Sequence, residues 1–337
     1  TDVFVQRWSG FRAADDWQPV GTAPLAVKRL EPGQYRFLAV SPDGTSFAEW
    51  NALLLESGRE ALTVLNVSTD SASGPENASA DNVEDRLTGG DANQGQPDLA
   101  RVLQARFIPT SEVIEGMVYV EPGVYRVSTE QGPTENRELP GVYIDRTEVT
   151  NADYQVFVQA TGAAEPYYWR FADDFDAIAD LPVMWIPFED AEAYARWQGK
   201  RLPTLEEWQA AARGPDRHLY PGGLETPPDV IHGERGHNPE TIYTAYIANV
   251  VDARVPAEWD DADGLLHLYS NVREKTGTVN LTRRSAIIAG RGWSDPVAQF
   301  SLESWGTGPF DFPEPRTGFR CAKSDPATLN EKGMMSE

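Results

Sequence analysis

The chain has 337 residues, 52 of them acidic and 29 basic, with a formal charge of −23 and a single cysteine. Such acidity argues against nucleic acid and anionic membrane surfaces as partners, because binding to either relies on Lys and Arg facing phosphate. One cysteine excludes an internal disulfide and a cysteine-based zinc site, and no stretch approaches the length of apolar sequence that spans a bilayer.

Residues 24–68 predict a small β module. Four stretches, APLAVKRL, QYRFLAV, AEWNALLL and ALTVLNV, are separated by turn-forming residues such as Glu-Pro-Gly at 31–33 and Pro-Asp-Gly at 42–44. Four short strands joined by tight turns favour an antiparallel meander in a small sandwich or sheet. Residues 1–68 are therefore the first predicted domain, and their polar side chains indicate no catalytic site.

Residues 69–111 predict a linker. Positions 69–100 are rich in Ser, Ala, Asn, Asp and Gly and have few aromatic or β-branched residues. Such a segment cannot bury enough apolar area to offset the entropy lost on ordering. A short amphipathic piece, 99–107, follows it.

Residues 112–324 form the second predicted domain, and 325–337 form a C-terminal tail. The segment MVYVEPGVYRV predicts a hairpin with Glu-Pro-Gly at its turn. Helices are predicted at 150–162, 189–199 and 204–214, because each has an apolar face and a closing glycine.

No long helix is predicted beyond Gly214. About 110 residues of loops, turns and short strands follow it.

An ordered set of motifs over roughly 210 residues resembles the formylglycine-generating-enzyme (sulfatase-modifying factor) domain family. The most specific motif is WQGKRLPTLEEW at 197–208, followed by AARG. The resemblance implies a loop-rich variant of the C-type lectin fold, and hence an α+β chain in which the small β module precedes this domain. The other motifs are GMVYVEPGVY at 116–125, EVTNADY at 148–154, PV at 182–183, DAEAY at 190–194, GL at 264–265, NVRE at 271–274, GRGWS at 290–294 and GFR at 318–320.

The resemblance does not extend to the copper chemistry. Family members that oxidise a substrate cysteine to formylglycine hold copper with a cysteine pair, and the matching stretch 294–301, SDPVAQFS, contains none. Oxygen donors cannot replace this pair, because Cu(I) prefers soft thiolates. Cys321 is expected to be a small buried residue. The sulfoxide synthases that share the domain need a histidine cluster, whereas the four histidines here are scattered.

Calcium is the one metal that the resemblance leaves open. In the family a calcium site forms from backbone carbonyls and a glutamate, and the matching positions are Tyr269, Ser270, Val272 and Glu274. Calcium accepts such an irregular set of oxygen ligands. The alternative is that Glu274 pairs with the bases on either side of it.

The segment 293–312 is the predicted binding surface, because in the family this region lies near the open face that holds substrate. Aromatic side chains on loops give large contact area at low entropic loss. For Trp293 a place in the core is the favoured alternative. The predicted partner-binding residues are Trp293, Asp295, Phe300, Trp305, Phe310 and Phe312.

Family motifs without the cysteine ligands predict a non-catalytic binding or structural protein that docks on a protein partner or larger assembly. One alternative is an enzyme of altered chemistry, with Asp295 and Glu303 as cleft carboxylates of raised pKa. Another is a ligand-binding variable protein of a diversity-generating retroelement, which the family fold also supports. The acidic, loop-rich chain favours a periplasmic or extracellular location. No cofactor is assigned besides the open calcium site.

Overall fold

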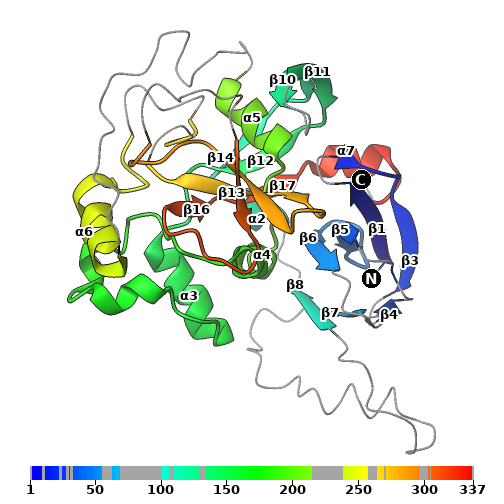
Figure 1. Ribbon diagram of the computed structural model, residues 1–337. Coiled ribbons are helices and arrows are strands. Elements are labelled where there is room, and N and C mark those ends of the chain that lie inside the picture. Colours follow the sequence, from blue (N-terminus) through cyan, green and yellow to red (C-terminus); the bar gives the residue numbers. More distant parts are fainter. Residues whose placement is uncertain are drawn as a thin grey trace, which may run out of the picture.

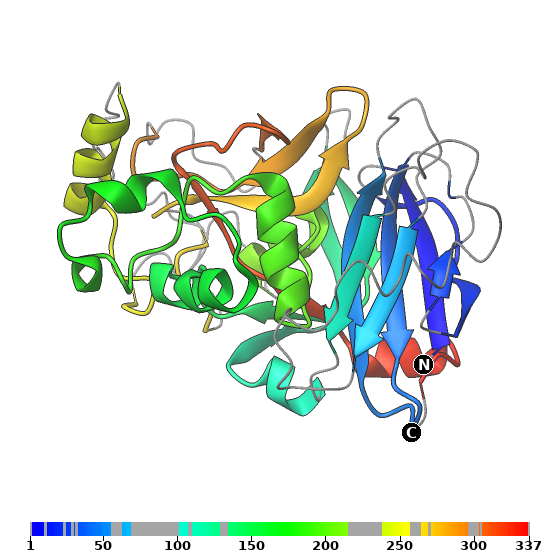
Figure 2. The same ribbon diagram turned by 90° about the horizontal axis from the view of Figure 1, so that it is seen from below.

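The computed structural model describes most of both predicted domains, and its elements form a mixed α+β structure (Figures 1 and 2). The predicted linker positions 69–100 lie outside the described residues. Those residues are 2–9, 12–22, 25–27, 30, 33–54, 63–68, 101–106, 110–128, 134–214, 238–256, 264–268, 271–295, 303 and 305–335.

The N-terminal part contains a five-stranded sheet in the order β2-β1-β5-β6, with β3 also paired to β1. Alternating apolar residues give this sheet its own core, in which Phe37 stacks on Trp50 with ring centroids 5.5 Å apart. The strands are β1 (Asp2–Ser9), β2 (Arg12–Ala13), β3 (Gln18–Thr22), β5 (Gly33–Val40) and β6 (Phe47–Leu54).

The predicted meander is wrong in its pairing. Strand β4 (Leu25–Val27) pairs with β7 (Thr63–Ser68) and not with its neighbour β5, whereas β5 and β6 do form a hairpin. Strand β8 (Arg101–Arg106) lies parallel to β7, at the amphipathic piece in the predicted linker. Turn residues mark where the chain reverses but do not fix which strands exchange hydrogen bonds, and β1 takes the place beside β5.

Three further sheets build the second part: β17-β12-β9, β10-β11 and β15-β14-β13-β16. The predicted hairpin at 117–127 is wrong, because β9 pairs with β12 and β10 pairs with β11, so the Glu-Pro-Gly turn joins two sheets. The strands are β9 (Met117–Val120), β10 (Gly123–Ser128), β11 (Thr134–Leu139), β12 (Val142–Asp145), β13 (Arg273–Asn280), β14 (Ser285–Ala289), β15 (Gly306–Pro309), β16 (Thr317–Phe319) and β17 (Ala322–Ser324).

The three predicted helices are confirmed as α3 (Asn151–Thr161), α4 (Phe188–Trp197) and α5 (Leu205–Arg213). Capping boxes start two of them: the threonines before α3 and α5 each accept the backbone N–H three residues on. Shorter helical elements are α2 (Thr110–Ile114), η2 (Tyr167–Phe171), η3 (Phe175–Ala177) and α7 (Pro326–Glu331).

The expectation of no long helix beyond Gly214 is wrong. Helix α6 (Pro239–Asn249) begins at a capping box in which Asn238 pairs with Thr241, and it places Pro239 in its first turn. Thr, Ile and Tyr residues have only moderate helix propensity, so its sequence gave a weak helical signal.

A buried polar network joins the N-terminal sheet to the second part. Glu49 of β6 accepts hydrogen bonds from Arg201 Nε at 3.1 Å and from the backbone N–H of Ser324 at 2.5 Å. Lys323 Nζ donates to the carbonyls of Phe47 at 2.7 Å and Gly199 at 2.8 Å. Because these groups are buried, the contact between the two parts depends on paired polar atoms.

Helix α7 and the turn after it pack against the N-terminal sheet, and Figures 1 and 2 both show them beside its strands. Leu329 and Met334 share an apolar cluster with Leu38, Val40 and Phe47. The C-terminal helix therefore covers apolar side chains of β5 and β6.

Lys323 gives the protein a predicted pH dependence. Burial lowers the pKa of Lys323 to about 7, although Glu49 opposes the shift. Above this pH the folded chain releases a proton that the unfolded chain keeps up to its ordinary pKa, so the free energy of unfolding rises with pH in this range. We expect Lys323→Met to lose that rise.

The measurement is chemical denaturation of wild type and Lys323→Met at about pH 7, 8 and 9. The free energy of unfolding of wild type minus that of Lys323→Met should increase as the pH increases. Lys275, whose pKa burial also lowers to about 7, is the same in both proteins and cancels. A difference that stays constant with pH would contradict the prediction.

Candidate functional site

The members of the predicted surface that the structure describes do not share one exposed face. Trp293 is only 1% exposed and Phe310 only 2%, because both belong to the core of the second part and Phe310 packs on Phe188. Trp305 is half-buried, and Phe312 alone is well exposed, at 56%. Phe300 lies outside the described residues.

The two carboxylates proposed for altered chemistry are held in ion pairs. Asp295 is buried and accepts from Arg273 Nε at 2.7 Å and from the backbone N–H of Gly292 at 2.9 Å. Burial raises the pKa of Asp295, but these bonds outweigh it and the net shift is downward. Glu303 pairs with Arg126 at 2.9 Å and Arg213 at 3.3 Å. The raised pKa expected for Asp295 is therefore wrong.

Glu274, the predicted calcium carboxylate, pairs with neither neighbouring base. It is 1% exposed and accepts from Arg320 Nε at 2.8 and 2.9 Å and from Trp208 Nε1 at 2.8 Å. Val272 is buried beside it, and Tyr269 and Ser270 lie outside the described residues. Both carboxylate oxygens of Glu274 are thus already hydrogen-bonded, and calcium binding stays a prediction.

A second carboxylate lies close to this pair. Glu148 is fully buried, where it accepts from Asn271 Nδ2 at 3.0 Å, and burial raises its pKa to about 8 despite the nearby His267. Among the described residues no group of three or more His, Cys, Asp and Glu side chains is arranged to hold a metal ion.

Copper does not fit the donor set of this chain. Cys321 is confirmed as a fully buried residue, and burial raises the pKa of its thiol well above the ordinary value. A protonated, enclosed thiol is a poor metal ligand. With no other cysteine in the sequence, a thiolate pair cannot form within the chain.

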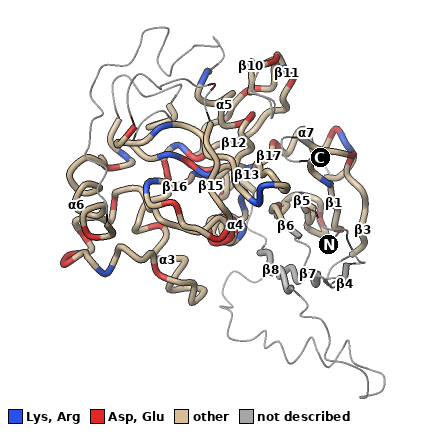
Figure 3. Tube along the Cα trace, in the orientation of Figure 1, with Lys and Arg blue, Asp and Glu red and all other residues tan. Residues whose placement is uncertain are grey.

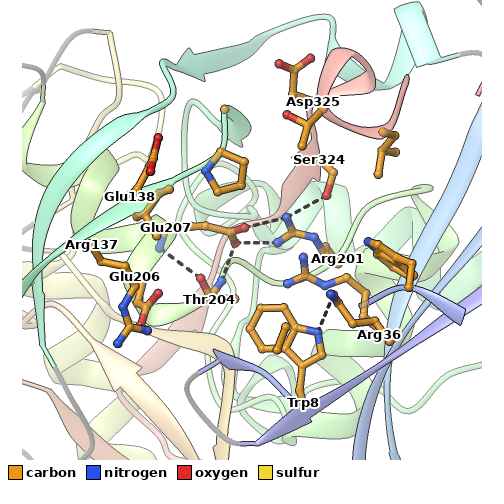
Figure 4. A pocket seen from close by; sticks show the side chains of 18 of the residues that line it. Trp8, Arg36, Arg137, Glu138, Arg201, Thr204, Glu206, Glu207, Ser324 and Asp325 are labelled. Carbon is orange, nitrogen blue, oxygen red and sulfur yellow. Dashed lines mark hydrogen bonds and ion pairs between the residues drawn. The ribbon is translucent and has the colours of Figure 1, made fainter. Parts of the chain in front are cut away.

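A pocket of about 530 Å³ lies where the N-terminal sheet meets the second part (Figure 4). Side chains from β1, β5, β11, the start of α5 and α7 line it. Its volume falls in the range of small-ligand sites. It is therefore the candidate functional site.

Arg201 and its partners form the centre of the pocket in Figure 4. Its guanidinium donates to both oxygens of Glu207, at 2.7 and 2.8 Å, and also to Glu49. Burial raises the pKa of Glu207, but Arg201 and Arg36 reverse the shift and lower it to about 2. The carboxylate thus stays ionised, and both its oxygens are committed to Arg201.

Arg36 is a buried charged group of the pocket that forms no ion pair with another described residue. It is 7% exposed, and its Nε has no hydrogen-bond partner in the described part of the chain. Its guanidinium carbon lies 4.3 Å from the ring centroid of Trp8. Burial lowers the pKa of Arg36 to about 10, so it remains charged at neutral pH.

The outer part of the pocket carries two carboxylates, Glu138 and Asp325, and the exposed Lys332. Glu138 is exposed, while Asp325 is half-buried and accepts from Tyr119 Oη at 2.7 Å. Figure 4 places Glu138 and Asp325 on one side of the pocket and Arg36 with Trp8 on the other. Arg137 is engaged with Glu206. Its two sides therefore differ in charge.

Acidic residues elsewhere are spread over α3, α4, α6 and the β10–β11 region (Figure 3). Arg36 faces the pocket from inside a chain with a formal charge of −23. A positive group within so acidic a protein gives the pocket an electrostatic potential that differs from that of the surrounding surface.

The sequence did not reveal this pocket, because its residues come from both predicted domains. Trp8 and Arg36 belong to the β module, which was expected to carry no site, and Glu207 belongs to the strongest family motif. The one available signal was Arg36, a charged residue within the apolar run QYRFLAV.

Several known proteins are similar to this chain. A formylglycine-generating enzyme of Thermomonospora curvata is 26% identical, over 64% of this chain and 95% of that enzyme. The inactive C-alpha-formylglycine-generating enzyme 2 of Mus musculus is 31% identical, over 43% of this chain and 50% of that protein. The solved structure of Treponema denticola variable protein 1 superimposes with a TM-score of 0.48 at 13% identity, covering 62% of this chain and 95% of that one.

The resemblance drawn from the motifs is confirmed by a match of residues 104–325 to the sulfatase-modifying factor enzyme 1-like domain. This range holds all the strands of the second part of the structure and Arg201 and Lys323, which hydrogen-bond to the N-terminal sheet. The chain belongs to the sulfatase-modifying factor enzyme 1-like family.

Proposed function

We propose that this protein is a non-catalytic member of its family that binds a protein partner through the pocket between its two parts. The observation that carries the proposal is the buried, charged Arg36, which lines this pocket and whose Nε donates no hydrogen bond to any described residue. A buried charge without such a bond is costly for a fold to keep, so a ligand that pairs with it would account for its presence.

The residues of the family domain support a non-catalytic role. Cys321 is enclosed, and the stretch that matches the copper-binding segment offers Ser and Asp instead of sulfur. Asp295 and Glu303, the carboxylates considered for another reaction, are ion-paired. The family contains enzymes and at least one protein described as inactive, so membership alone favours neither role.

We also propose a periplasmic or extracellular location, which the acidic, loop-rich chain favours. Within the described residues no helix is long and apolar enough to cross a membrane.

The experiment isolates the tagged full chain from the organism that encodes it and measures the stoichiometry of any complex by native mass spectrometry. Thr328→Trp fills the pocket from α7, and Ala327→Trp, on an exposed position of the same helix outside the pocket, is the matched control. We expect a stoichiometric protein complex with wild type and the control that is lost in Thr328→Trp. A complex that survives in Thr328→Trp, or no complex with wild type, would overturn the proposal.

A further inference from the structure

The surroundings of the Arg36 guanidinium indicate which kind of ligand the pocket would bind. The indole of Trp8 covers one face of its guanidinium at 4.3 Å, so the edge of the guanidinium is the part that can donate hydrogen bonds. Arg36 forms no ion pair with a carboxylate in the described ranges, and Arg201 beside it adds repulsion. A group that completes this site has to be an anion with acceptors in one plane.

The carboxylates nearest to Arg36 are occupied elsewhere. Both carboxylate oxygens of Glu207 accept hydrogen bonds from Arg201, and Glu49 accepts hydrogen bonds from Arg201 and from Ser324. Their charges attract Arg36 at longer range, but their oxygens are already used. The missing acceptor therefore has to come from outside these groups.

The acidic side of the pocket selects among anions. Glu138 and Asp325 would repel a phosphate or another multiply charged ligand more strongly than Lys332, which also lines the pocket, attracts it, because they carry two negative charges against one positive charge. A single carboxylate pairs with a guanidinium in plane and carries the smallest charge that does so. The acidic groups then favour a ligand whose other end is cationic or rich in N–H donors.

The remaining walls suit a peptide. Trp8, Trp17 and Leu329 supply apolar contact area, and a volume of about 530 Å³ has room for a few residues. A peptide terminus combines one carboxylate, backbone N–H groups and apolar side chains. The carboxylate complements Arg36, and the N–H groups complement Glu138 and Asp325. The apolar side chains complement Trp8, Trp17 and Leu329.

We propose that the pocket binds the free α-carboxylate end of a peptide, with the carboxylate on Arg36 and the N–H or cationic groups of the peptide toward Glu138 and Asp325. This inference rests on the proposed function, since it names the ligand of the same pocket. The N-terminal sheet then acts as half of a peptide receptor that the family domain completes.

The test titrates the full chain with a tripeptide library carrying free carboxyl termini, followed by calorimetry on its best member. Its C-terminal amide, its N-acetyl form, acetate and inorganic phosphate are the comparison ligands. We expect amidation to weaken binding at least tenfold and N-acetylation to weaken it less, because the rim also contacts backbone N–H groups. Acetate and phosphate should bind at least tenfold more weakly than the free peptide.

Arg36→Gln should lower affinity at least tenfold, and Arg137→Gln, an arginine of the same pocket that Glu206 already engages, should leave it within about twofold. Arg36→Lys keeps the positive charge but loses the paired N–H donors of the guanidinium. It replaces Arg36→Gln in the test if Arg36→Gln does not fold. It should bind the peptide at least threefold more weakly than wild type.

Equal binding of acid and amide, a preference for phosphate or acetate, or unchanged affinity in the folded Arg36 variant would overturn the inference, as would no binding by any tripeptide. The outcomes separate the two proposals. If Thr328→Trp abolishes partner binding while tripeptides never bind, the pocket is a docking site for other chemistry. If Thr328→Trp changes neither partner binding nor tripeptide binding, the proposed function fails together with this inference.

Discussion

Replacing Arg320 by Met is expected to lower the free energy of unfolding by about 3–5 kcal/mol, the range for removing one partner of a buried ion pair. Arg320 is fully buried and its guanidinium donates to both oxygens of Glu274 and to the carbonyl of Leu266 at 2.8 Å. Without it Glu274, itself 1% exposed, keeps Trp208 as its one donor among the residues that the structure describes. Urea denaturation of the two proteins measures the change.

A matched control shows whether the effect comes from burial. Arg126→Met removes an arginine that pairs with Glu303 at the surface, where its side chain is 53% exposed, and exposed pairs contribute only about 0–1 kcal/mol. The double variant Arg320→Met/Glu274→Gln should recover part of the loss, because no charge is left unpaired. Equal destabilisation by Arg320→Met and Arg126→Met would show that Glu274 is not held by Arg320.

Replacing Glu49 by Ala is expected to detach the N-terminal sheet before the rest of the protein unfolds. Glu49 is 1% exposed, and it joins Arg201 to the backbone and hydroxyl of Ser324, at 2.5 and 2.7 Å. Burial raises its pKa, but Arg201 and Lys323 outweigh this and lower it, so the carboxylate is ionised. Its removal leaves a buried N–H and part of a buried guanidinium without an acceptor. This loss is expected to lower the free energy of unfolding by about 3 kcal/mol.

Hydrogen exchange measured by mass spectrometry distinguishes this local effect from general destabilisation. Backbone amides of β5 and β6 should exchange at least tenfold faster in Glu49→Ala, whereas those of α3 and β13 should change little. Glu135→Ala, at an exposed position on β11, is the control and should change neither set. Uniform acceleration across α3, β5 and β13 would contradict the prediction.

The sequence predicted local structure well wherever one short segment carried the whole signal. Helices α3 and α5 were found because a threonine cap and a residue three positions later satisfy the first backbone N–H groups within a few residues. The family was found because its motifs recur in order, and the match over residues 104–325 confirms it.

Strand pairing was not predictable in the same way. Glu-Pro-Gly sequences precede β5 and β10, but β10 takes its partner from β11 and β5 takes one from β1. Pairing is a long-range choice decided by which apolar faces must be covered, and no single turn encodes it.

The candidate site was hidden for a related reason. Aromatic residues in a loop-rich segment indicate either a surface or a core, and Trp293 and Phe310 fill the core while Phe312 remains exposed. The pocket instead depends on Trp8 and Arg36, which meet Glu207 only after the two parts of the chain pack together. Composition cannot show such a meeting of distant segments.

Mass spectrometry of a cysteine-containing peptide, incubated with the chain, Cu(I) and oxygen, tests the non-catalytic role most directly. Because Cys321 is enclosed and the matching stretch 294–301 has no sulfur, we predict that the peptide keeps the mass of intact cysteine at every copper concentration. A formylglycyl peptide formed in proportion to the amount of this protein would contradict the proposal that the protein is non-catalytic.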